Sequence, residues 1–383
     1  MHDALILGAG RSPFGARHGR FAKRHPADLL GEVLTAVLAR SGTDPAAVDE
    51  VLVGCATPVG AQASNLAAAS VRASGHLREA LPASVVSTQD TSSLVAVLRA
   101  LDAVRSGRCG IVLVGGVELM STVPAGADLS HRGFGLPLPP PQGQELLPPG
   151  PAAERWARRR DVSRARLEDL AQRSRRRARD AQVAGRLSPE LLPVAGGASQ
   201  PSTDTVADER LCAGEAGDQS FTEGLYSRDG LLTAATVAPM ADGAAAAVVA
   251  SPAAARRLGI EPLAGVVAAA AVGGDPGAGC GSSPEAARRA LALAGVGSGE
   301  VVRVELAELF ATGLAHWEAD RPDLAEVLNP DGGSLALGHP QGATGLGLVA
   351  RLVRALTAPG GAGHGLAACD ASDGHGVAVL LQA

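Results

Sequence analysis

Apolar positions along this chain alternate between two patterns, the helical spacing of three or four residues and the unbroken run of a buried strand. An amphipathic helix is predicted from Asp28 to Ser41, and the segment GTDPAAVDE leads from it into the strand VLVG. Much later, SPEAARRALALAGVG leads through SGE into the strand VVRVEL. Glu50 and Glu300 take corresponding places in these segments, 300 − 50 = 250 residues apart.

A second pair of segments keeps nearly the same offset. SSLVAVLRALDAVRSGRCGIVLVGG predicts a helix, a glycine stop and a buried strand, and TGLGLVARLVRALTAPGGAGHGLAAC repeats that order. Leu98 corresponds to Arg351, since 351 − 98 = 253. A period this long indicates two duplicated domains rather than a solenoid. Strands that alternate with helices in each half predict α/β layers, with helices covering a mostly parallel sheet.

The middle of the chain differs from both halves. The proline-rich stretch from Gly135 to Pro151 predicts a loop, because proline lacks the amide hydrogen that a helix or central strand uses. A helix follows, with Ser163 as its cap and Gly185 as its stop. We therefore divide the chain into the first part of the N-terminal half, an inserted domain, the end of that half, and the C-terminal half: 1–117, 118–232, 233–252 and 253–383.

Composition and charge narrow the class of protein. A chain of 383 residues with 46% hydrophobic content can build two or three domains' worth of core. The net charge of −5 gives no general attraction to nucleic acid or to an anionic membrane. The apolar runs are shorter than the ~20 residues that span a bilayer, and the N-terminus lacks a basic region followed by an apolar core. We expect a cytoplasmic protein without nucleic-acid or membrane partners.

The cysteines and the glycine-rich start of the chain point to no bound metal or cofactor. Five cysteines are scattered singly without a CxxC pair, which argues against a disulfide framework or a zinc knuckle. The sequence shows no cluster of metal ligands. LGAGRSPFG lacks the GxGxxG spacing of a dinucleotide site. We expect no metal and no cofactor.

Several motifs together resemble the thiolase family, the CoA-dependent enzymes that make or cleave 3-ketoacyl thioesters by Claisen chemistry. GAGRSPFGARHGRF is similar to the family's opening strand and loop, GGVELMSTVP to its GGMESMS segment, and MADGAAAAVVAS to its INDGAAA segment. DVSRARLEDLAQRSRRRARDAQVAGRL resembles the helix of its loop domain. The most specific match is DGGSLALGHPQGATG, which is similar to NxxGGAxAxGHPxGxxG. The resemblance covers essentially the whole chain.

This resemblance implies the thiolase fold, an α/β fold with two duplicated halves in a five-layer arrangement and an inserted loop domain that covers CoA. It also implies a homodimer or homotetramer. The substrate would be an acyl-CoA or an acyl group on a carrier protein, and the loop domain favours CoA. CoA would then enter as part of a thioester substrate and not as a cofactor.

The chain departs from the family at both catalytic cysteines. VVSTQDTSSLVAV places Asp90 where the nucleophilic cysteine should be. At the CxGGGxG signature the chain reads CDASDGHGVAVLL, and counting back from Gly376 puts Asp370 at the acid/base cysteine. Cys369 would lie one place early and face away, because a one-residue slip in a strand reverses the side chain. His339 survives in GHP, and its offset of 339 − 90 = 249 from Asp90 predicts that the two meet in one site.

Other positions of the family's site change as well. The NEAF segment becomes LAELF, so the active-site asparagine position is Ala307, while Glu308 remains and is expected to be a structural carboxylate under the site. The serine near the pantetheine is Ala238. His375 stands where the family usually has an apolar residue. It is expected either to add a donor near Asp370 or to pack beneath the glycine turn, and we favour packing.

The expected CoA contacts are Arg173, Arg176, Ala238 and Gly338, the last of which precedes His339. Arg173 and Arg176 belong to an arginine run on the predicted loop-domain helix. Such a run indicates either a solvated helix face or a site for the phosphates of a nucleotide-bearing ligand. The sequence leaves both interpretations open.

An aspartate cannot carry an acyl group as a cysteine does. A cysteine at a helix N-terminus has a lowered pKa and forms a stable thioester, whereas an acylated aspartate is a mixed anhydride that water attacks readily. We therefore expect direct acyl transfer to a hydroxyl or amine acceptor, in a specialised metabolic pathway. Asp90 would be the general base, His339 and backbone amides would stabilise the oxyanion, and Asp370 would share a proton with Asp90.

Two alternatives remain open. Asp90 can be a helix cap in a catalytically inactive subunit that assembles with a partner enzyme. The chain can also be a Claisen-type C-acyltransferase with unusual catalytic residues. Replacement of both cysteines by the same ionisable residue favours an enzyme over decay of the site.

Overall fold

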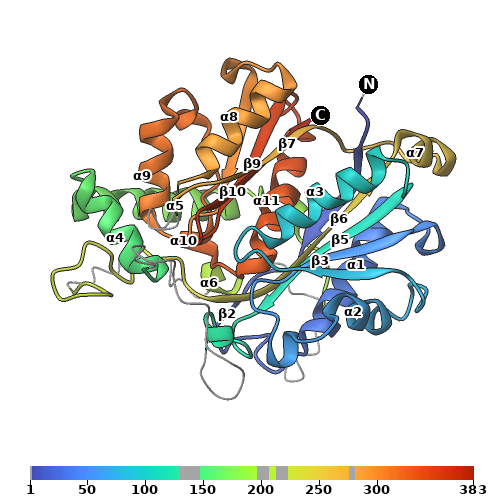
Figure 1. The fold of residues 1–383 in the computed structure, drawn as a ribbon, viewed down its shortest axis with the longest axis horizontal. Coiled ribbons are helices and arrows are strands. Elements are labelled where there is room, and N and C mark those ends of the chain that lie inside the picture. Colours follow the sequence, from blue (N-terminus) through green and yellow to red (C-terminus); the bar gives the residue numbers. More distant parts are fainter. Residues whose placement is uncertain (1, 130–146, 196–206, 213–222, 276–280) are drawn as a thin grey trace.

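The computed structural model describes residues 2–129, 147–195, 207–212, 223–275 and 281–383, which form two α/β halves and a helical insertion (Figure 1). The N-terminal half contains β1 (Leu5–Arg11), β2 (Gly15–Ala16), α1 (Pro26–Ser41), β3 (Glu50–Gly54), α2 (Leu66–Ser74), β4 (Ala83–Val86), α3 (Ser92–Arg105), β5 (Ile111–Leu119) and β6 (Ala241–Ala250). The inserted segment contains α4 (Pro149–Arg159), α5 (Arg164–Val183) and α6 (Glu209–Cys212). The C-terminal half contains α7 (Pro252–Leu258), β7 (Ala264–Gly273), α8 (Ser283–Ala294), β8 (Val301–Leu306), α9 (Ala311–Asp320), α10 (Ser334–Leu337), α11 (Gln341–Leu356), β9 (His364–Asp370) and β10 (His375–Gln382).

The strands form one continuous sheet whose order is β4-β3-β5-β6-β1-β7-β10-β9-β8, with β2 paired to β6. β3 is parallel to β4 and β5, and β8 is parallel to β9. The other pairs are antiparallel, so our prediction of a mostly parallel sheet is wrong. Strands buried on both faces have the same unbroken apolar sequence in either pairing. Chain connections decide the direction, because the short turn between β9 and β10 can only join antiparallel neighbours.

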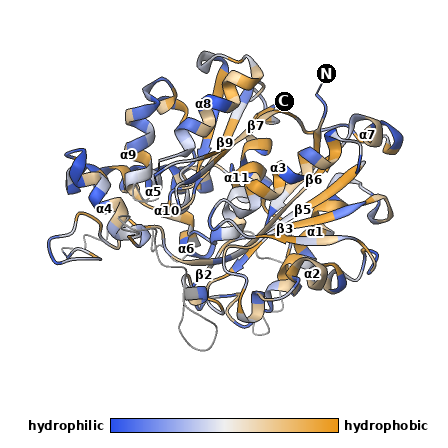
Figure 2. Ribbon diagram, in the orientation of Figure 1, coloured by the Kyte–Doolittle hydropathy of each residue, from blue (hydrophilic) through white to orange (hydrophobic). Residues whose placement is uncertain are grey.

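The helices and the two halves of the sheet form the five layers that the family resemblance implies. α1 packs on one face of the N-terminal strands, and α3 packs on the other. α11 lies beside α3 and contacts strands of both halves, while α8 covers the outer face of β7, β9 and β10 (Figure 1). Apolar residues are concentrated on the strands and central helices (Figure 2), so α3 and α11 form a buried middle layer.

Glycine permits the close approach of the two central helices to their neighbours. A Cβ at Gly345 of α11 would lie 2.7 Å from Leu94 Cγ of α3, and one at Gly54 would lie 2.3 Å from the Ser93 amide nitrogen. The Ser93 hydroxyl accepts a hydrogen bond of 3.0 Å from the Leu346 amide, which ties the helices together. These contacts set the two helix N-termini side by side.

The inserted segment confirms one predicted element and corrects another. Ser163 caps α5 by accepting from the Arg166 amide, and Gly185 follows with a φ of 71°. The predicted loop from Gly135 to Pro151 lies outside the described residues up to position 146, and its last residues begin α4. Proline is tolerated in the first turn of a helix because backbone N–H groups there make no hydrogen bond within the helix. The four-segment domain division stays a prediction.

No helix in the described ranges is both long enough and apolar enough to cross a membrane. The described part of the chain also shows no group of three or more His, Cys, Asp and Glu residues suited to hold a metal ion.

A buried ionic network joins α11 to the insertion. Arg351 lies 3.0 Å from Glu190 Oε1 and donates to the Gly332 carbonyl over 2.8 Å. Glu190 also pairs with Arg11, which in turn pairs with Asp208 over 2.6 Å. The pKa of Arg351 is raised because its buried neighbours are acidic, although desolvation is the largest single effect and acts in the opposite direction. All four residues of the network are buried. Removal of one partner would therefore leave an unpaired charge in the core.

We expect Arg351→Met to lower the free energy of unfolding by about 3–5 kcal/mol, because Glu190 would keep its burial and lose a charged partner. Urea unfolding followed by circular dichroism measures the change. Arg99→Met is the matched control, since Arg99 pairs with Asp102 while 68% exposed and should cost less than about 1 kcal/mol. Equal losses in the two variants would contradict the role assigned to the buried network.

Candidate active site

Asp90 and His339 meet where the two central helices begin. Asp90 lies in the turn before α3 and His339 in the turn before α11, and 2.7 Å separate Asp90 Oδ1 from His339 Nε2. The residues are 3% and 2% exposed. The predicted meeting of the two duplicated positions is therefore confirmed, and the site contains a buried acid–histidine pair.

Asp90 does not cap its helix. The N-cap of α3 is Thr91, and no side chain makes a capping hydrogen bond there. The preceding residue, Gln89, has a φ of 50°, a left-handed conformation that costs energy in any residue with a side chain. Ser372 donates to the Gln89 side chain and holds this turn. The capping interpretation of Asp90 is wrong because the turn directs its carboxylate to His339.

His339 is held from two sides. Its Nδ1 lies 3.0 Å from the Thr344 hydroxyl, and its backbone amide donates to the Pro239 carbonyl over 2.9 Å. Gly338 has a φ of 99°, and a Cβ there would lie 2.7 Å from the Ala241 Cβ. A neutral imidazole that donates from Nε2 to a carboxylate accepts at Nδ1, and a hydroxyl can supply that hydrogen. Thr344 therefore fixes the ring for its bond to Asp90.

Cys369 and Asp370, at the end of β9, point in directions opposite to those that we predicted. Cys369 faces the site, and its thiol donates to the Asp90 carbonyl over 3.2 Å. The Asp370 carboxylate turns the other way and accepts from the Ser283 amide and hydroxyl over 2.6 and 2.7 Å. The sequence count from Gly376 failed because the extra residue lies in the turn, outside the strand, and leaves the alternation of β9 intact.

The expected proton sharing between Asp90 and Asp370 is thus not supported by the contacts. Asp370 instead anchors the start of α8, and Trp317 donates to the same Ser283 hydroxyl over 2.8 Å. Burial raises the pKa of the Asp370 carboxyl, and the bonds from Ser283 oppose that shift. Burial, followed by the charges of Asp90 and Asp370, raises the pKa of the Cys369 thiol well above its usual value. Cys369 is accordingly a protonated donor and a poor nucleophile.

Glu308 lies beneath the site as a structural carboxylate, as the sequence predicted. It accepts from the Ser174 hydroxyl and from Asn329 Nδ2, both over 2.6 Å, and burial raises its pKa. Ala307 is buried, and its amide donates to the Ala368 carbonyl over 3.0 Å.

His375 lies beside the helix that follows Asp90. Its Nδ1 is 3.2 Å from the Thr91 hydroxyl, so its ring contacts the start of α3. The expected donor role of His375 beside Asp370 does not appear among its described contacts, and Asp370 accepts from Ser283 instead.

Another buried carboxylate beside the site, Glu118, was not predicted from the sequence. It accepts from the amides of Ala56, Thr57 and Gly342 over 2.8, 3.2 and 3.1 Å, and from Gln62 over 2.6 Å. Burial raises its pKa, and these four donors oppose the shift. Glu118 links both halves next to the site. The acidic residue in GGVELM was the available sequence signal.

A cavity of about 370 Å³ is lined by both Asp90 and His339. Most of its wall is apolar and includes Met120, Pro148, Val237, Ala238, Met240, Leu309 and Phe310. Thr57, Gln89, Asp128, Gln341 and Ser372 add polar groups, and the lining contains no lysine or arginine from the described part of the chain. An apolar cavity with few polar groups at its base is typical of a small-molecule site.

The arginines of α5 do not line this cavity. Arg173 pairs with Glu318, Arg175 donates to the Ala235 carbonyl, and Arg177 donates to the Leu328 carbonyl. Arg176 is exposed. The phosphate-binding interpretation of Arg173 and Arg176 remains a prediction, while three arginines of this run brace the insertion.

The fold and cavity define an α/β enzyme with its site at the junction of duplicated halves. Two family models cover the chain, "Thiolase, N-terminal domain" over residues 4–253 and "Thiolase, C-terminal domain" over residues 260–383. The chain belongs to the thiolase family, and with it to the acyltransferases of that superfamily.

Individual thiolases are similar to this chain over nearly its full length. The steroid 3-ketoacyl-CoA thiolase FadA6 of Mycobacterium tuberculosis is 32% identical over 94% of this chain and 89% of that protein. An acetyl-CoA acetyltransferase of Paracoccus denitrificans is 31% identical over 100% of both chains. The human mitochondrial 3-ketoacyl-CoA thiolase is 26% identical, with a TM-score of 0.87 over 100% of this chain and 99% of that one. The same human enzyme, solved in complex with CoA, gives a TM-score of 0.86.

Cys369 should resist alkylation in the folded protein at pH 8. Its raised pKa leaves less thiolate at this pH than an ordinary cysteine has, and burial excludes the reagent. Iodoacetamide labelling followed by peptide mass spectrometry measures the modified fraction, and the urea-unfolded protein is the control. Native labelling as fast as in the unfolded chain would disprove this placement of the thiol.

Proposed function

We propose that this protein transfers an acyl group from an acyl-CoA thioester directly to a hydroxyl or amine acceptor, with Asp90 as general base. The observation that carries the proposal is the buried Asp90–His339 pair on the wall of an apolar cavity. Among the described residues, only His339 bonds the Asp90 carboxylate, through Oδ1, which leaves Oδ2 for an acceptor. The human relative solved with CoA supports the choice of thioester.

In this scheme the acceptor oxygen or nitrogen attacks the thioester carbonyl carbon while its proton passes to Asp90 Oδ2. The carbonyl π electrons move to oxygen. When the tetrahedral intermediate collapses, the C–S bond breaks and the leaving thiolate takes the proton back from Asp90. No oxidant or reductant is required, and the carboxylate is regenerated.

His339 has two tasks in this scheme. Its bond to Oδ1 orients Asp90 before reaction, and Thr344 holds the ring in place. As negative charge grows on the thioester oxygen, the same N–H can be shared with it and stabilise the oxyanion together with backbone amides. The resting bond to Asp90 therefore adds an orienting role to the expected role of His339 at the oxyanion.

Two features of the site disfavour a covalent acyl-enzyme. Acylated Asp90 would be an anhydride exposed to hydrolysis, and Cys369 is buried and kept as a thiol. We further propose a homodimer or homotetramer in the cytoplasm, which the partly exposed edge strand β4 supports, since such an edge can pair with another chain.

Two other functions have support in the site. Asp90 stands where the family has its nucleophilic cysteine, and the loss of that cysteine favours an inactive subunit that assembles with a catalytic partner. A carboxylate next to an apolar cavity also suits a Claisen-type C-acyltransferase, in which Asp90 would remove a proton from the carbon beside a thioester carbonyl.

Asp90→Asn and His339→Ala should each reduce thiol release from an acyl-CoA in the presence of alcohol or amine acceptors, by about 10²–10⁴-fold. Loss of the base or of its orienting partner removes proton transfer from the acceptor. A panel of acyl-CoAs and acceptors, followed with a thiol reagent, measures the rates. Asp102→Asn is the control, because Asp102 is 72% exposed on α3.

The products of the same assay separate the candidates. Acylated alcohol or amine supports the proposal, and mass spectrometry should detect no acylated protein during turnover. A new 3-ketoacyl thioester would identify the Claisen enzyme. If no thioester reacts although CoA binds, the proposed transferase fails and the inactive-subunit function is favoured.

Thr344→Val should lower the rate by about tenfold or more, because His339 Nδ1 loses the hydroxyl that fixes the ring. Thr344→Ser keeps that hydroxyl and should restore most of the rate. If valine and serine variants behave alike, Thr344 does not position His339. Urea unfolding of both variants separates this effect from loss of stability.

A further inference from the structure

The segment that joins β9 to β10 lies against the turn that carries Asp90. We call residues 371–374 the β9–β10 turn and residues 89–91 the Asp90 turn. Side chains in the β9–β10 turn and at the strand ends beside it contact all three residues of the Asp90 turn. These contacts join Cys369 to the Asp90 carbonyl, Ser372 to the Gln89 side chain, and His375 to the Thr91 hydroxyl. The C-terminal half therefore holds the Asp90 turn along its whole length.

The Asp90 turn has a backbone conformation that needs support from its surroundings. Gln89 has a φ of 50°, which is unfavourable for a residue with a side chain and persists only where neighbouring groups enforce it. The helix that follows gives no help from a side chain, because no capping hydrogen bond is made at Thr91. Contacts from outside the turn must therefore fix the direction in which the Asp90 carboxylate points.

His375 contacts this turn from outside the active-site cavity. The Thr91 hydroxyl donates its one hydrogen to the Thr88 carbonyl over 2.6 Å, so it accepts from Nδ1 of His375 over 3.2 Å. Gln89 and Ser372 line the cavity that contains Asp90, whereas His375 is not among its lining residues. An effect of His375 on the reaction would therefore pass through Thr91 to Asp90.

The β9–β10 turn is itself fixed on its other side. The Gly374 carbonyl accepts from the Ser282 hydroxyl over 2.7 Å and from the Gly274 amide over 2.8 Å. The Ala371 amide donates to the His375 carbonyl over 2.7 Å. In this turn ASDG takes the place of the three glycines in the signature CxGGGxG, so a serine hydroxyl is available where glycine offers no side chain.

We propose that the β9–β10 turn holds the Asp90 turn in its left-handed conformation, and that Ser372 and His375 are thereby positioning residues for Asp90 as general base. This inference rests on the proposed function. Only 2.7 Å separate Asp90 Oδ1 from His339 Nε2, and a small rotation of the backbone before Asp90 would break that bond. A displacement of about 1 Å in a catalytic group can reduce a rate by about 10²-fold.

The first test is the kinetics of thiol release with the acyl-CoA and acceptor that react best. His375→Ala should lower kcat by about tenfold or more and leave KM unchanged, because His375 does not line the cavity. His375→Asn keeps an N–H donor toward Thr91 and should restore most of kcat. His364→Ala is the matched control, because His364 begins β9 at the end opposite the site.

A second pair of variants tests the backbone conformation itself. Gln89→Gly and Gln89→Ala both remove the bond to Ser372, but glycine adopts a φ of 50° without strain. The glycine variant should therefore keep a kcat roughly fivefold higher than the alanine variant. Equal kcat values would show that the conformation of residue 89 does not limit the reaction, and would overturn the inference.

Hydrogen exchange followed by mass spectrometry tests the same contacts without a substrate. The amides of Thr91 and Ser92 donate to the carbonyls of Thr88 and Gln89 over 3.2 and 3.1 Å. In His375→Ala both amides should exchange about fivefold faster, the factor that corresponds to loss of one hydrogen bond of ordinary strength.

Equal kcat in the alanine and asparagine variants of His375 would overturn the inference, and so would unchanged exchange or an equal effect in His364→Ala. Faster exchange in a protein that turns over no thioester would support the hold on the Asp90 turn and reject the transferase. Turnover that needs Asp90 but does not respond to His375→Ala would do the reverse. If His375→Ala does not fold, Ser372→Ala compared with Ser372→Thr makes the same test, because threonine keeps the hydroxyl.

Discussion

The hydrogen bond between Asp90 and His339 depends on the close meeting of two duplicated helices, and most of the surrounding structure serves that meeting. α3 and α11 cross in the middle layer, where glycines remove the side chains that would hold them apart. Gln89 and Gly338 take left-handed backbone conformations immediately before the two residues. The bond joins one residue from each half, so the site exists only when both halves are folded together.

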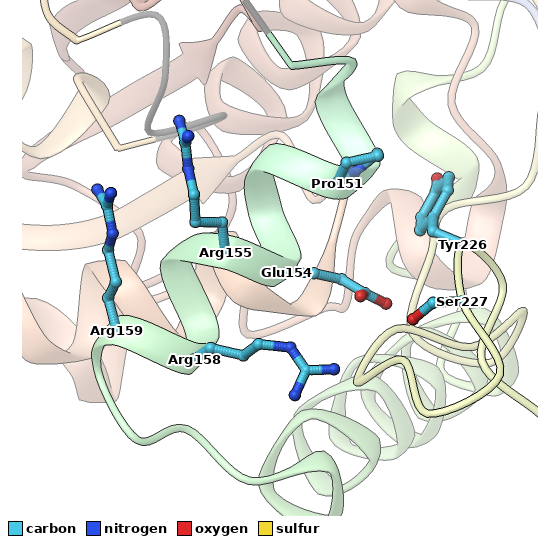
Figure 3. A pocket seen from close by; sticks show the side chains of 7 residues that line it. All are labelled: Pro151, Glu154, Arg155, Arg158, Arg159, Tyr226 and Ser227. Carbon is cyan, nitrogen blue, oxygen red and sulfur yellow. The ribbon is translucent and has the colours of Figure 1, made fainter. Parts of the chain in front are cut away.

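Charge is distributed unevenly around this bond. Asp90 faces the cavity, whereas Asp370 is turned into the start of α8 and Glu308 and Glu118 are enclosed by donors. Burial raises the pKa of each of these last three carboxyls, and the hydrogen bonds that they accept oppose that shift. Three arginines of α4 line a neighbouring cavity (Figure 3), and no described arginine lines the one that contains Asp90.

The sequence predicted the order of helices and strands, the duplication, and the meeting of Asp90 with His339, because residues at corresponding places in two similar halves are related by their common fold. It could not predict strand direction or the side chain that faces Asp90 from β9. Pairing between β9 and β10 places the extra residue in the turn, and that register turns Cys369 inward. Counting back along the sequence from Gly376 cannot reveal which residues pair between the two strands.

What the sequence by itself determined is the family, the layered fold and the chemical change at Asp90, since these depend on residue identity and order. Only the tertiary structure decided that Asp90 is not a cap, that Asp370 is an anchor, and that Thr344 holds His339. It also decided that arginines of α4 line a second cavity, which shares Tyr226 with the active-site cavity, while those of α5 brace the insertion. The reason is physical: a side chain's partners come from segments distant in sequence, and their packing sets its direction.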